Sequence, residues 1–440
     1  MIFWKQLPFV KRSYIPLRVL LAFSMFMLTV LLYIDRACIS AAKEEISSDL
    51  HFDLTDFGWV MAMFTLGYAL FQTPSGKWAD KKGPRGVIAS IVTIWSVLTA
   101  LTGAAWNYVS MLIIRFLFGA GEAGAFPSLA KVVYNWFPVR ERGIVQGINF
   151  SGSRIGAAFA LPLVAIIINS VGWRMSFAIF GCIGLFFAML WWFLFRNRPE
   201  ESGTISEKEK LFILEHREKA VSREKVNLGF GTIIRSGNMW LAMLQYMASN
   251  FTFYFTLTWM YPYLKDRFAL GGVEAGLYAM VPLLAGAAGN WISGLWVDWL
   301  YKKQNVTISR RLPAITGFIL AAFGMLMMAR IDTPQVAIVL LAIAIFGADM
   351  TLSPSWAFCI DIGKENAGAV SGTMNMAGNL GAFVTIIAFP YLYEWTGSFQ
   401  PFFYICMVLS AIAIGIWLGM KSGNVIGSAK LSRRNTVKSE

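Results

Sequence analysis

The sequence predicts an all-α membrane protein of about twelve transmembrane helices, arranged as two homologous six-helix bundles. Three observations support this fold class. Of the 440 residues, 57% are hydrophobic and only 14% are charged, which excludes an ordinary soluble domain. Apolar segments of about 18 or more residues recur along the chain, and each can cross the ~30 Å hydrocarbon core of a bilayer. A hydrophilic stretch near the middle and two repeated motifs divide these segments into halves.

The apolar segments define the predicted spans and domains. In chain order the spans are 17–39, 57–76, 87–106, 108–131, 144–169, 173–195, 238–264, 274–297, 313–330, 335–358, 367–391 and 400–420. We predict an N-terminal bundle over 1–195, a cytoplasmic linker over 196–237, a C-terminal bundle over 238–420 and a cytoplasmic tail over 421–440. In the linker, Ser206 and Glu209 have the spacing of a helical capping box, which predicts an amphipathic helix there.

Basic residues gather in alternate gaps between the spans, as they do on the cytoplasmic side of membrane proteins. The net charge is +13. The basic clusters are Lys5, Lys11, Arg12 and Arg18; Lys77, Lys81, Lys82 and Arg85; Arg140 and Arg142; Lys302, Lys303, Arg310 and Arg311; and Lys421, Arg433 and Arg434. Because the other gaps are acidic or nearly uncharged, this pattern indicates membrane orientation rather than nucleic-acid binding. Both termini are therefore predicted to be cytoplasmic.

Two short motifs occur once in each half. "GKWAD" at 76–80 and "GLWVD" at 294–298 share G-x-W-x-D, and each ends an apolar span before a basic cluster. "GIVQG" at 143–147 and "GAVSG" at 368–372 share G-x-V-x-G at the start of a span. Their nearly equal displacement predicts the parallel repeat seen in many transporters.

Two of the predicted spans carry both an acid and a base. Arg115 and Glu122 are seven residues apart, or about 10 Å along a helix, so they share a face without forming a direct ion pair. The first span offers partners in Asp35 and Arg36. Charges inside a membrane are costly and more often mark an ion or substrate path than a structural tie. A salt-bridge cluster that only holds helices together, and snorkelling of Asp35 and Arg36 to the interface, are the alternatives.

The segment "GAGEAG" matches the dinucleotide-binding pattern G-x-G-x-x-G, but we reject that interpretation. No β-strand precedes the segment, and a membrane span surrounds it. Gly119, Gly121 and Gly124 are instead predicted to allow close packing of neighbouring helices.

Several of these motifs are characteristic of a known family. "GKWADKKGPR" resembles the loop motif between the second and third helices of the major facilitator superfamily. "YIDR", "RFLFGAGEAGAFPS", "YNWFPVRERG", "GWR" and "GNLGAF" resemble, more narrowly, its anion:cation symporter family, which includes bacterial sugar-acid (hexuronate and galactonate) transporters. The resemblance covers nearly the whole chain and implies the major facilitator fold.

The resemblance also implies residue roles. Asp35 and Glu122 match the family's protonatable carboxylates, and Arg36 and Arg115 match cations that serve the substrate carboxylate or pair with those acids. Tyr33, Tyr68 and Asn379 match polar contacts in the central cavity. Gly76, Asp80, Arg85 and Asp298 match a conformational latch on the cytoplasmic side.

The sequence departs from the family near the expected substrate site. Ser153 stands where sugar-acid carriers often have glutamine, and an additional cation, Arg154, follows it. Tyr261 stands where relatives often have proline. Ser153 is retained as a candidate substrate contact, but these differences leave the exact substrate open.

Other polar residues in the spans are candidates for the cavity wall, although interhelical hydrogen bonds would explain each of them equally well. They are Gln72, Asn149, Asn250, Thr252, Tyr254, Asn290, Asn375 and Ser355. Asp361 is assigned to a cytoplasmic loop, whereas Asp349 is predicted to be buried and has no assigned role.

The leading functional hypothesis is proton-coupled symport of a small organic anion, such as a hexuronate or an aldonate, by alternating access. Burial favours a protonated carboxyl group and a nearby arginine favours the charged form. Glu122 and Asp35 are therefore expected to exchange protons as the bundles rock, so that the substrate and the side-chain carboxylates compete for the same arginines. The alternative is an exchanger of organic anions or phosphate esters, which has less use for the two acids. A non-transporting receptor is a minor alternative.

The sequence gives no sign of catalytic chemistry. Its two histidines and four cysteines form no metal-ligand or nucleophile–base pattern, so we expect no enzyme activity, no metal and no cofactor beyond a proton gradient. The expected partners are the organic anion and the lipid bilayer, and the chain is expected to act as a monomer in a bacterial inner membrane.

Overall fold

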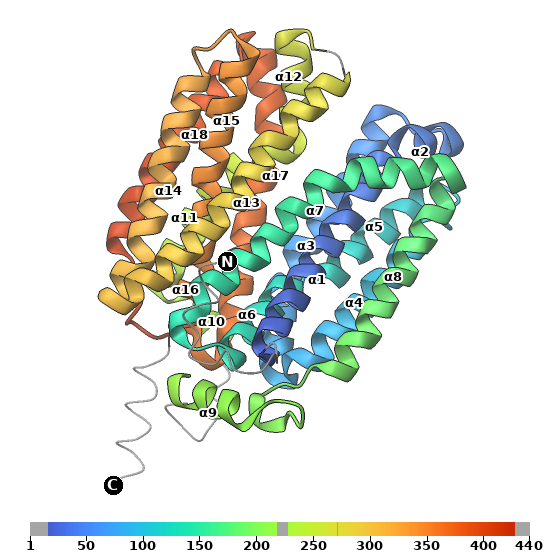
Figure 1. Ribbon diagram of the computed structural model, residues 1–440. Coiled ribbons are helices and arrows are strands. Elements are labelled where there is room, and N and C mark those ends of the chain that lie inside the picture. Colours follow the sequence, from blue (N-terminus) through green and yellow to red (C-terminus); the bar gives the residue numbers. More distant parts are fainter. Residues whose placement is uncertain (1–15, 218–227, 271, 427–440) are drawn as a thin grey trace.

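The computed structural model describes residues 16–217, 228–270 and 272–426. Within these ranges the secondary structure is helical and contains no strand, so the predicted all-α fold class is confirmed. Figure 1 shows two groups of long helices side by side, with the short helix α9 (Glu207–His216) lying across one end. We call that end of the molecule the linker end.

The first group of helices comes from the N-terminal half. Its members are α1 (Leu17–Ala41), α2 (Lys43–Leu50), α3 (Leu54–Lys82), α4 (Pro84–Thr102), α5 (Tyr108–Glu122), α6 (Ala125–Trp136), α7 (Arg142–Val171) and α8 (Trp173–Leu194). Short polar motifs set the starts of α3 and α5. Asp53 and Asp56 form a reciprocal capping box at α3, and Asn107 and Ser110 form one at α5.

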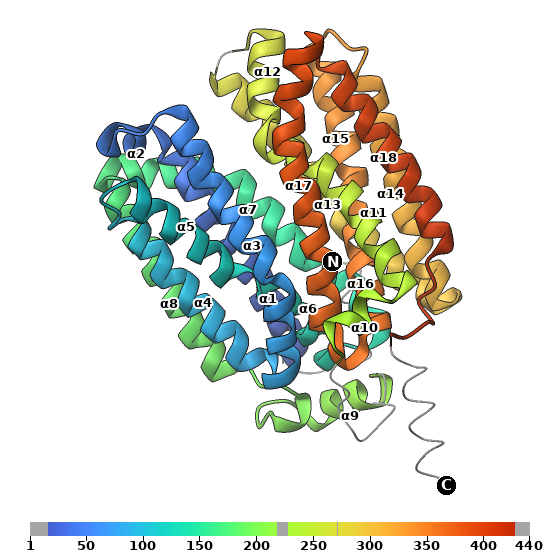
Figure 2. The same cartoon turned by 180° about the vertical axis from the view of Figure 1, so that it is seen from behind.

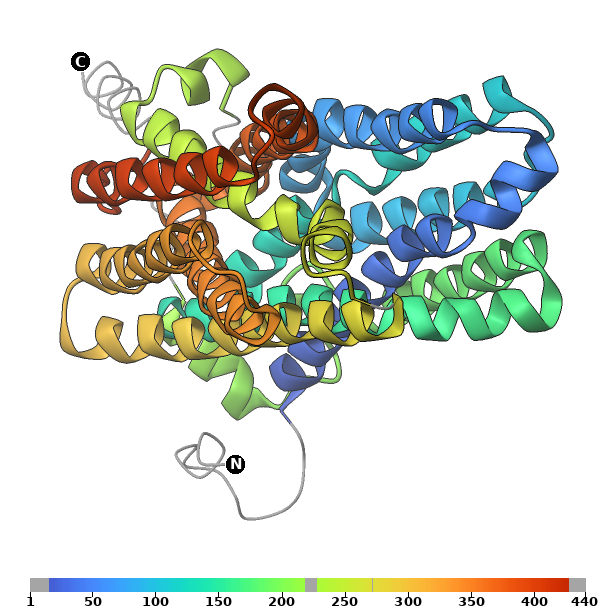
Figure 3. The same cartoon turned by 90° about the horizontal axis from the view of Figure 1, so that it is seen from above.

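The second group comes from the C-terminal half. Its members are α10 (Phe230–Ile234), α11 (Gly237–Thr258), α12 (Met260–Phe268), α13 (Gly272–Lys303), α14 (Val306–Met328), α15 (Pro334–Met350), α16 (Leu352–Gly363), α17 (Ala367–Thr396) and α18 (Gln400–Gly419). Viewed from above, the two groups occupy separate halves of the molecule (Figure 3). Figures 1 and 2 show that their ribbons diverge away from the linker end.

In the described part of the chain, eight helical stretches are long and apolar enough to cross a membrane by length and composition. One of them extends from Pro334 to Thr396 and contains two of the predicted spans. The helices α3, α7 and α11 are not among the eight. With 29, 30 and 22 residues, they are nevertheless long enough for the ~30 Å hydrocarbon core.

Two predicted spans are each divided into two helices at corresponding places in the halves. The break between α5 and α6 precedes Pro127, and the break between α15 and α16 precedes Pro354. Proline has no backbone N–H to donate to the carbonyl four residues earlier. At Pro354 that carbonyl belongs to Met350, and the hydroxyl of Ser293 donates to it at 2.5 Å. A neighbouring helix thus satisfies the freed group, as membrane burial requires.

The predicted packing role of the glycines is confirmed. A Cβ atom on Gly119 of α5 would lie within 3.0 Å of the backbone of Phe64 and Tyr68 in α3. Gly121 and Gly124 likewise leave no room for a Cβ atom beside the side chains that they face. The backbones of α3 and α5 therefore touch, which only glycine permits here.

The two bundles meet closely at the linker end, where α3 lies beside α17 (Figure 2) and α7 beside α13 (Figure 1). Asp80, near the end of α3, accepts hydrogen bonds from the backbone N–H groups of Gly368 at 3.0 Å and Ala369 at 2.8 Å. These groups belong to the first turn of α17, where the helix dipole favours a negative charge. We call this contact the first latch.

A second latch has the same design with the bundles exchanged. Asp298, near the end of α13, accepts from the backbone N–H groups of Gly143 at 2.9 Å and Ile144 at 2.8 Å, in the first turn of α7. Each latch therefore joins the G-x-W-x-D motif of one half to the G-x-V-x-G motif of the other. The sequence repeat has a structural counterpart in these two contacts.

Buried ion pairs add to the contact between the bundles. Lys131 of α6 lies 3.4 Å from the carboxylate of Glu365. Asp361 accepts hydrogen bonds from Arg142 at 2.8 Å and from Arg310 at 2.9 Å. The assignment of Asp361 to a loop was wrong, because this residue is 2% exposed and lies within α16, whose helix continues to Gly363.

The prediction that Arg85 belongs to the latch is not supported by the geometry. Its guanidinium donates to the carbonyl of Trp192 at 2.8 Å and lies 4.4 Å from the centre of that indole ring. Gly83, with a φ of 87°, ends α3 and redirects the chain into α4. Arg85 therefore faces α8 of its own bundle.

The linker helix forms where the sequence predicts. The hydroxyl of Ser206 accepts from the N–H of Glu209 at 3.2 Å. The carboxylate of Glu209 does not complete the capping box but accepts from the N–H groups of Leu17 at 2.9 Å and Arg18 at 3.0 Å, at the start of α1. Because these N–H groups have no partner within α1, one glutamate both stabilises α1 and fastens the linker to it.

We expect Asp298→Asn to loosen the contact at the linker end. The change removes the charge that the helix dipole of α7 stabilises by about 0.3–2 kcal/mol. Spin labels on the exposed Lys81 and Lys303, at the ends of α3 and α13, should show a longer distance in double electron–electron resonance. The matched control is Glu394→Gln on the exposed part of α17, which should leave the distance unchanged. An unchanged distance in Asp298→Asn would contradict the latch.

Candidate functional site

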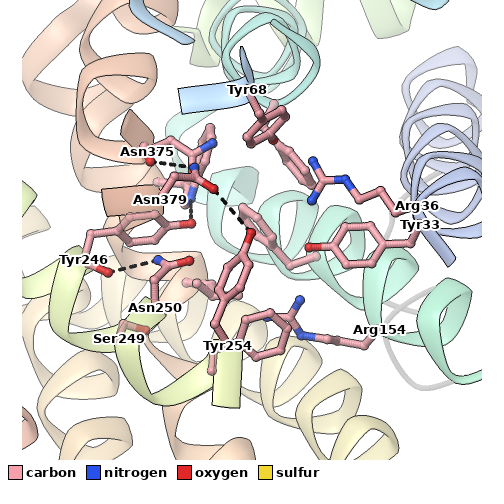
Figure 4. Close-up of a pocket in the computed structure, with 15 residues that line it drawn as sticks. Tyr33, Arg36, Tyr68, Arg154, Tyr246, Ser249, Asn250, Tyr254, Asn375 and Asn379 are labelled. Atoms are coloured by element: carbon pink, nitrogen blue, oxygen red, sulfur yellow. Dashed lines mark hydrogen bonds between the residues drawn. The ribbon is translucent and has the colours of Figure 1, made fainter. Parts of the chain in front are cut away.

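A pocket lies between the two bundles and receives side chains from both (Figure 4). It contains about 430 Å³ of space not filled by protein atoms, part of it open to solvent. Its lining residues are Tyr33, Arg36, Tyr68, Phe126, Phe150, Arg154, Tyr246, Ser249, Asn250, Phe253, Tyr254, Leu352, Trp356, Asn375 and Asn379. The two charged members, Arg36 and Arg154, are both arginines from the N-terminal bundle, and a guanidinium is the side chain best suited to bind a carboxylate with two hydrogen bonds.

Arg36 is the best-partnered of the predicted site residues. Its Nε donates to Oε1 of Glu122 at 2.6 Å, and its Nη2 forms an ion pair with the same oxygen. The guanidinium also lies 4.5 Å from the ring centre of Tyr68 and 4.9 Å from that of Tyr33. The aromatic rings and the carboxylate hold this cation at the edge of the pocket. The first span therefore provides the partner that Glu122 requires.

The other two predicted charges lie behind the pocket wall. Arg115 is 2% exposed and packs against the rings of Phe64 and Phe118, 5.0 and 4.8 Å from their centres. Asp35 is 1% exposed, and among the described residues neither of its carboxylate oxygens has a hydrogen-bond partner. The expected pairing of Asp35 with a base is therefore absent.

Arg154 and Asp349 form a second buried ion pair, which joins α7 to α15. Nε and Nη2 of Arg154 donate to the two carboxylate oxygens of Asp349 at 2.6 and 2.5 Å. Gly286 makes room for the acid, since a Cβ atom there would collide with Oδ2 of Asp349. Arg154 also lies 3.4 Å from the ring centre of Phe253. Arg154 and Asp349, to which the sequence assigned no role, are thus each other's ion-pair partners.

Amide and phenol groups of the C-terminal bundle face the two arginines across the pocket (Figure 4). The hydroxyl of Tyr254 donates to Asn379 at 3.3 Å, and the amide of Asn379 donates to the carbonyl of Asn375 at 2.8 Å. Asn250 donates to the carbonyl of Tyr246 at 2.9 Å. These groups offer neutral donors and acceptors of the kind that bind hydroxyl groups.

The structure brings together only part of the predicted substrate site. Tyr33, Arg36, Tyr68 and Asn379 line the pocket, as do three of the polar candidates, Asn250, Tyr254 and Asn375. Arg115 does not, because it lies behind the rings of Phe64 and Phe118. The other residues outside the lining are Asp35, Glu122, Ser153, Gln72, Asn149, Thr252, Asn290 and Ser355.

Ser153 was predicted to contact the substrate but points into its own helix. Its hydroxyl donates to the carbonyl of Phe150 at 2.6 Å. The neighbouring Arg154 lines the pocket instead, because adjacent residues on a helix point about 100° apart.

The sequence contained a signal for the Arg154–Asp349 pair that the predictions did not use. Arg142 and Arg154 are twelve residues apart in α7, and Asp349 and Asp361 are twelve apart across α15 and α16. Equal spacing of opposite charges on two antiparallel helices indicates two matched ion pairs, which the structure contains. Tyr246 and Trp356 carried no such signal, since aromatic residues are abundant in all the spans.

Comparisons with known proteins agree with this architecture. The family model described as Major Facilitator Superfamily matches residues 25–386. The chain is 31% identical over 372 residues to a probable sulfoacetate transporter of Cupriavidus necator, covering 84% of this chain and 86% of that one. It is 30% identical over 392 residues to a probable L-galactonate transporter of Escherichia coli strain K12, covering 88% and 85%.

A solved structure shows the same fold. The crystallised proton:xylose symporter XylE, bound to 6-bromo-6-deoxy-D-glucose, aligns over 92% of this chain and 96% of its own with a TM-score of 0.72 and 15% identity. The family model and the curated relatives together cover most of the chain and consist of transporters rather than enzymes. The chain is an integral membrane transport protein and belongs to the major facilitator superfamily.

Proposed function

We propose that the protein carries a small organic anion of the sugar-acid class across the membrane by proton-coupled symport with alternating access, acting as a monomer. The observation that carries this proposal is the Arg36–Glu122 pair at the edge of the pocket. It places a fixed cation where an anion can reach it, with a counter-ion that a proton can neutralise. The relatives named for sulfoacetate and L-galactonate support an organic acid as the substrate.

The pair suggests how protons and substrate are coupled. While Glu122 is charged, it occupies the guanidinium of Arg36. Protonation removes that competition, so a substrate carboxylate can bind Arg36 with two parallel hydrogen bonds. Asp35, which has no partner in the described structure, is a second position for a proton in the same bundle. The substrate and the proton would then move together, because either one alone leaves a buried charge unpaired.

The neutral side of the pocket suits the hydroxyl groups of a sugar acid. Asn250, Asn375 and Asn379 present amides, and Tyr254 presents a phenol, all from the C-terminal bundle. The acid group would bind the N-terminal bundle and the hydroxyl groups the C-terminal bundle. Binding would then draw the two bundles together, as alternating access requires.

The orientation follows from the positive-inside rule. The basic residues Lys81, Lys82, Lys302 and Lys303 lie at the linker end of α3 and α13, so that end is assigned to the cytoplasm. With the two latches closing the linker end, this orientation would make the state an outward-facing one. We also propose that the protein lies in a bacterial inner membrane with both termini in the cytoplasm.

Uptake into proteoliposomes tests the proposal. The purified protein should accumulate one labelled member of a panel of uronates, aldonates and aldarates when an inward proton gradient is imposed. Glu122→Gln should lose gradient-driven accumulation but retain counterflow, because a glutamine mimics the protonated acid and leaves Arg36 available. Glu394→Gln, on the exposed part of α17, is the matched control and should behave as wild type. Uptake that ignores the gradient and requires an anion on the opposite side would replace symport by exchange.

A further inference from the structure

We propose, on the basis of the proposed function, that Arg154 is a second anion-binding subsite and that the preferred substrate carries two acidic groups. Arg36 would bind one acidic group and Arg154 the other. The second group is a carboxylate or a sulfonate, since both present oxygens that a guanidinium binds with parallel hydrogen bonds.

The first argument is the position of the two guanidinium groups. Both line the same pocket, and Figure 4 shows them on one side of it with Tyr33 between them. Both are stacked on aromatic rings, Arg36 on Tyr68 at 4.5 Å and Arg154 on Phe253 at 3.4 Å. Their cationic groups are thus held in fixed places, which favours a ligand whose two acidic groups have a matching separation.

The second argument is the supply of free donors on Arg154. A guanidinium has five N–H groups, and Asp349 accepts from Nε and Nη2. The nearest partner of Nη1 within the described residues is the Ser153 hydroxyl, at a long 3.4 Å. One corner of the guanidinium therefore remains available to a ligand although the side chain is only 2% exposed. A residue that served only as a tie between helices would not need to line the pocket.

The third argument is that Asp349 belongs to the opposite bundle. Arg154 lies on α7, whereas Asp349 lies on α15, so their pair connects the two bundles at the pocket. An acidic group that binds the remaining corner of Arg154 shares the guanidinium with Asp349 and so weakens the hold of Arg154 on that residue. A substrate with two acidic groups would therefore weaken a contact between the bundles that a substrate with one would leave intact. Substrate choice and bundle movement would thus depend on the same arginine.

The test compares a mono-acid and a di-acid of the same carbon skeleton, galactonate and galactarate, in proteoliposomes. The wild-type protein should transport galactarate at least about tenfold more efficiently, in kcat/KM, because one additional charged contact is worth about 1.4 kcal/mol or more. The double variant Arg154→Gln/Asp349→Asn removes both charges and so leaves no buried ion unpaired. It should lose this preference, so that the ratio of its galactarate kcat/KM to its galactonate kcat/KM falls by at least about tenfold.

Two controls separate a binding role from a structural one. Arg142→Gln also breaks an ion pair between α7 and α16, but outside the pocket, and should lower uptake of both acids by the same factor. The second control is a measurement of thermal unfolding, which identifies a variant that fails to fold. If the double variant fails to fold, Arg154→Lys is used instead; it keeps the positive charge and should retain part of the preference for galactarate.

The outcomes are distinct. If the double variant lowers uptake of both acids equally, or if the wild type prefers galactonate, Arg154 is a structural tie and the inference is overturned. If the wild type transports neither acid, nor any other member of the sugar-acid panel, the proposed function itself fails. A galactarate preference that the double variant loses, that Arg154→Lys retains in part and that Arg142→Gln leaves unchanged supports the inference.

Discussion

Replacing Gly76 by valine should abolish uptake while leaving folding and membrane insertion intact. A Cβ atom at Gly76 would lie within 3.0 Å of the carbonyl oxygen of Gly368, across the contact between α3 and α17. The oxygen belongs to the backbone and the position of a Cβ atom is fixed by the backbone, so no side-chain rotation relieves the clash. Overpacking typically costs about 1–3 kcal/mol, and about 1.4 kcal/mol corresponds to a tenfold change in an equilibrium. The closed linker end should therefore become at least about tenfold less populated.

The matched control for this change is on the same helix. Gly58 of α3 has no atom within 4 Å of the place where its Cβ would stand, so Gly58→Val should leave uptake near wild type. Uptake is measured in proteoliposomes, and labels on Lys81 and Lys303 report the distance across the linker end. If Gly76→Val transports normally, the close approach of α3 and α17 is not part of the transport cycle.

Replacing Arg36 by glutamine should remove substrate binding as well as accumulation. Arg36 lines the pocket and holds Glu122, which is fully buried. Truncating one member of a buried ion pair costs about 2–5 kcal/mol, part of it from the unpaired partner. We therefore expect uptake at low substrate concentration to fall by at least about thirtyfold. Unlike Glu122→Gln, this variant should also lose counterflow.

A double variant separates binding from stability in this experiment. Arg36→Gln/Glu122→Gln removes both charges and should unfold at nearly the wild-type temperature, because no buried ion remains unpaired. It should nevertheless remain inactive in uptake and counterflow. Near-normal uptake by the double variant would show that the anion binds elsewhere, with Arg154 as the next candidate.

The general fold was predictable because the bilayer imposes a length on each apolar segment. Kinks at Pro127 and Pro354 were predictable too, but the division of each span into two helices was not, because the apolar pattern continues through it and a proline in a membrane helix is compatible with a continuous span. Whether the freed carbonyl finds a partner depends on a neighbouring helix, as Ser293 shows for Met350. That information lies in helix packing rather than in local sequence.

Of the two ion pairs at the candidate site, the Arg36–Glu122 pair was the easier to predict from the sequence. Arg36 and Glu122 attract attention in apolar spans, and their pairing requires only that two helices of one bundle be neighbours. The Arg154–Asp349 pair depends on how the two bundles meet, and its sequence signal, the equal twelve-residue spacing, can be interpreted only once α7 is known to lie antiparallel to α15 and α16. The isolation of Asp35 depends on the rotation of α1 about its axis, since a shift of one residue turns a side chain by about 100°.

The crossed arrangement of the latches makes the linker end equivalent to an isologous interface, the kind that joins the subunits of a two-fold symmetric dimer. Asp80 and Asp298 occupy equivalent positions in the two bundles, and each accepts hydrogen bonds from the opposite bundle, although both lie on one chain. Such an interface makes the same contact twice. Loss of one latch should loosen the linker end, and loss of both should remove the alignment of the bundles itself. The effect of a substitution in one latch motif should therefore depend on whether the other latch is intact.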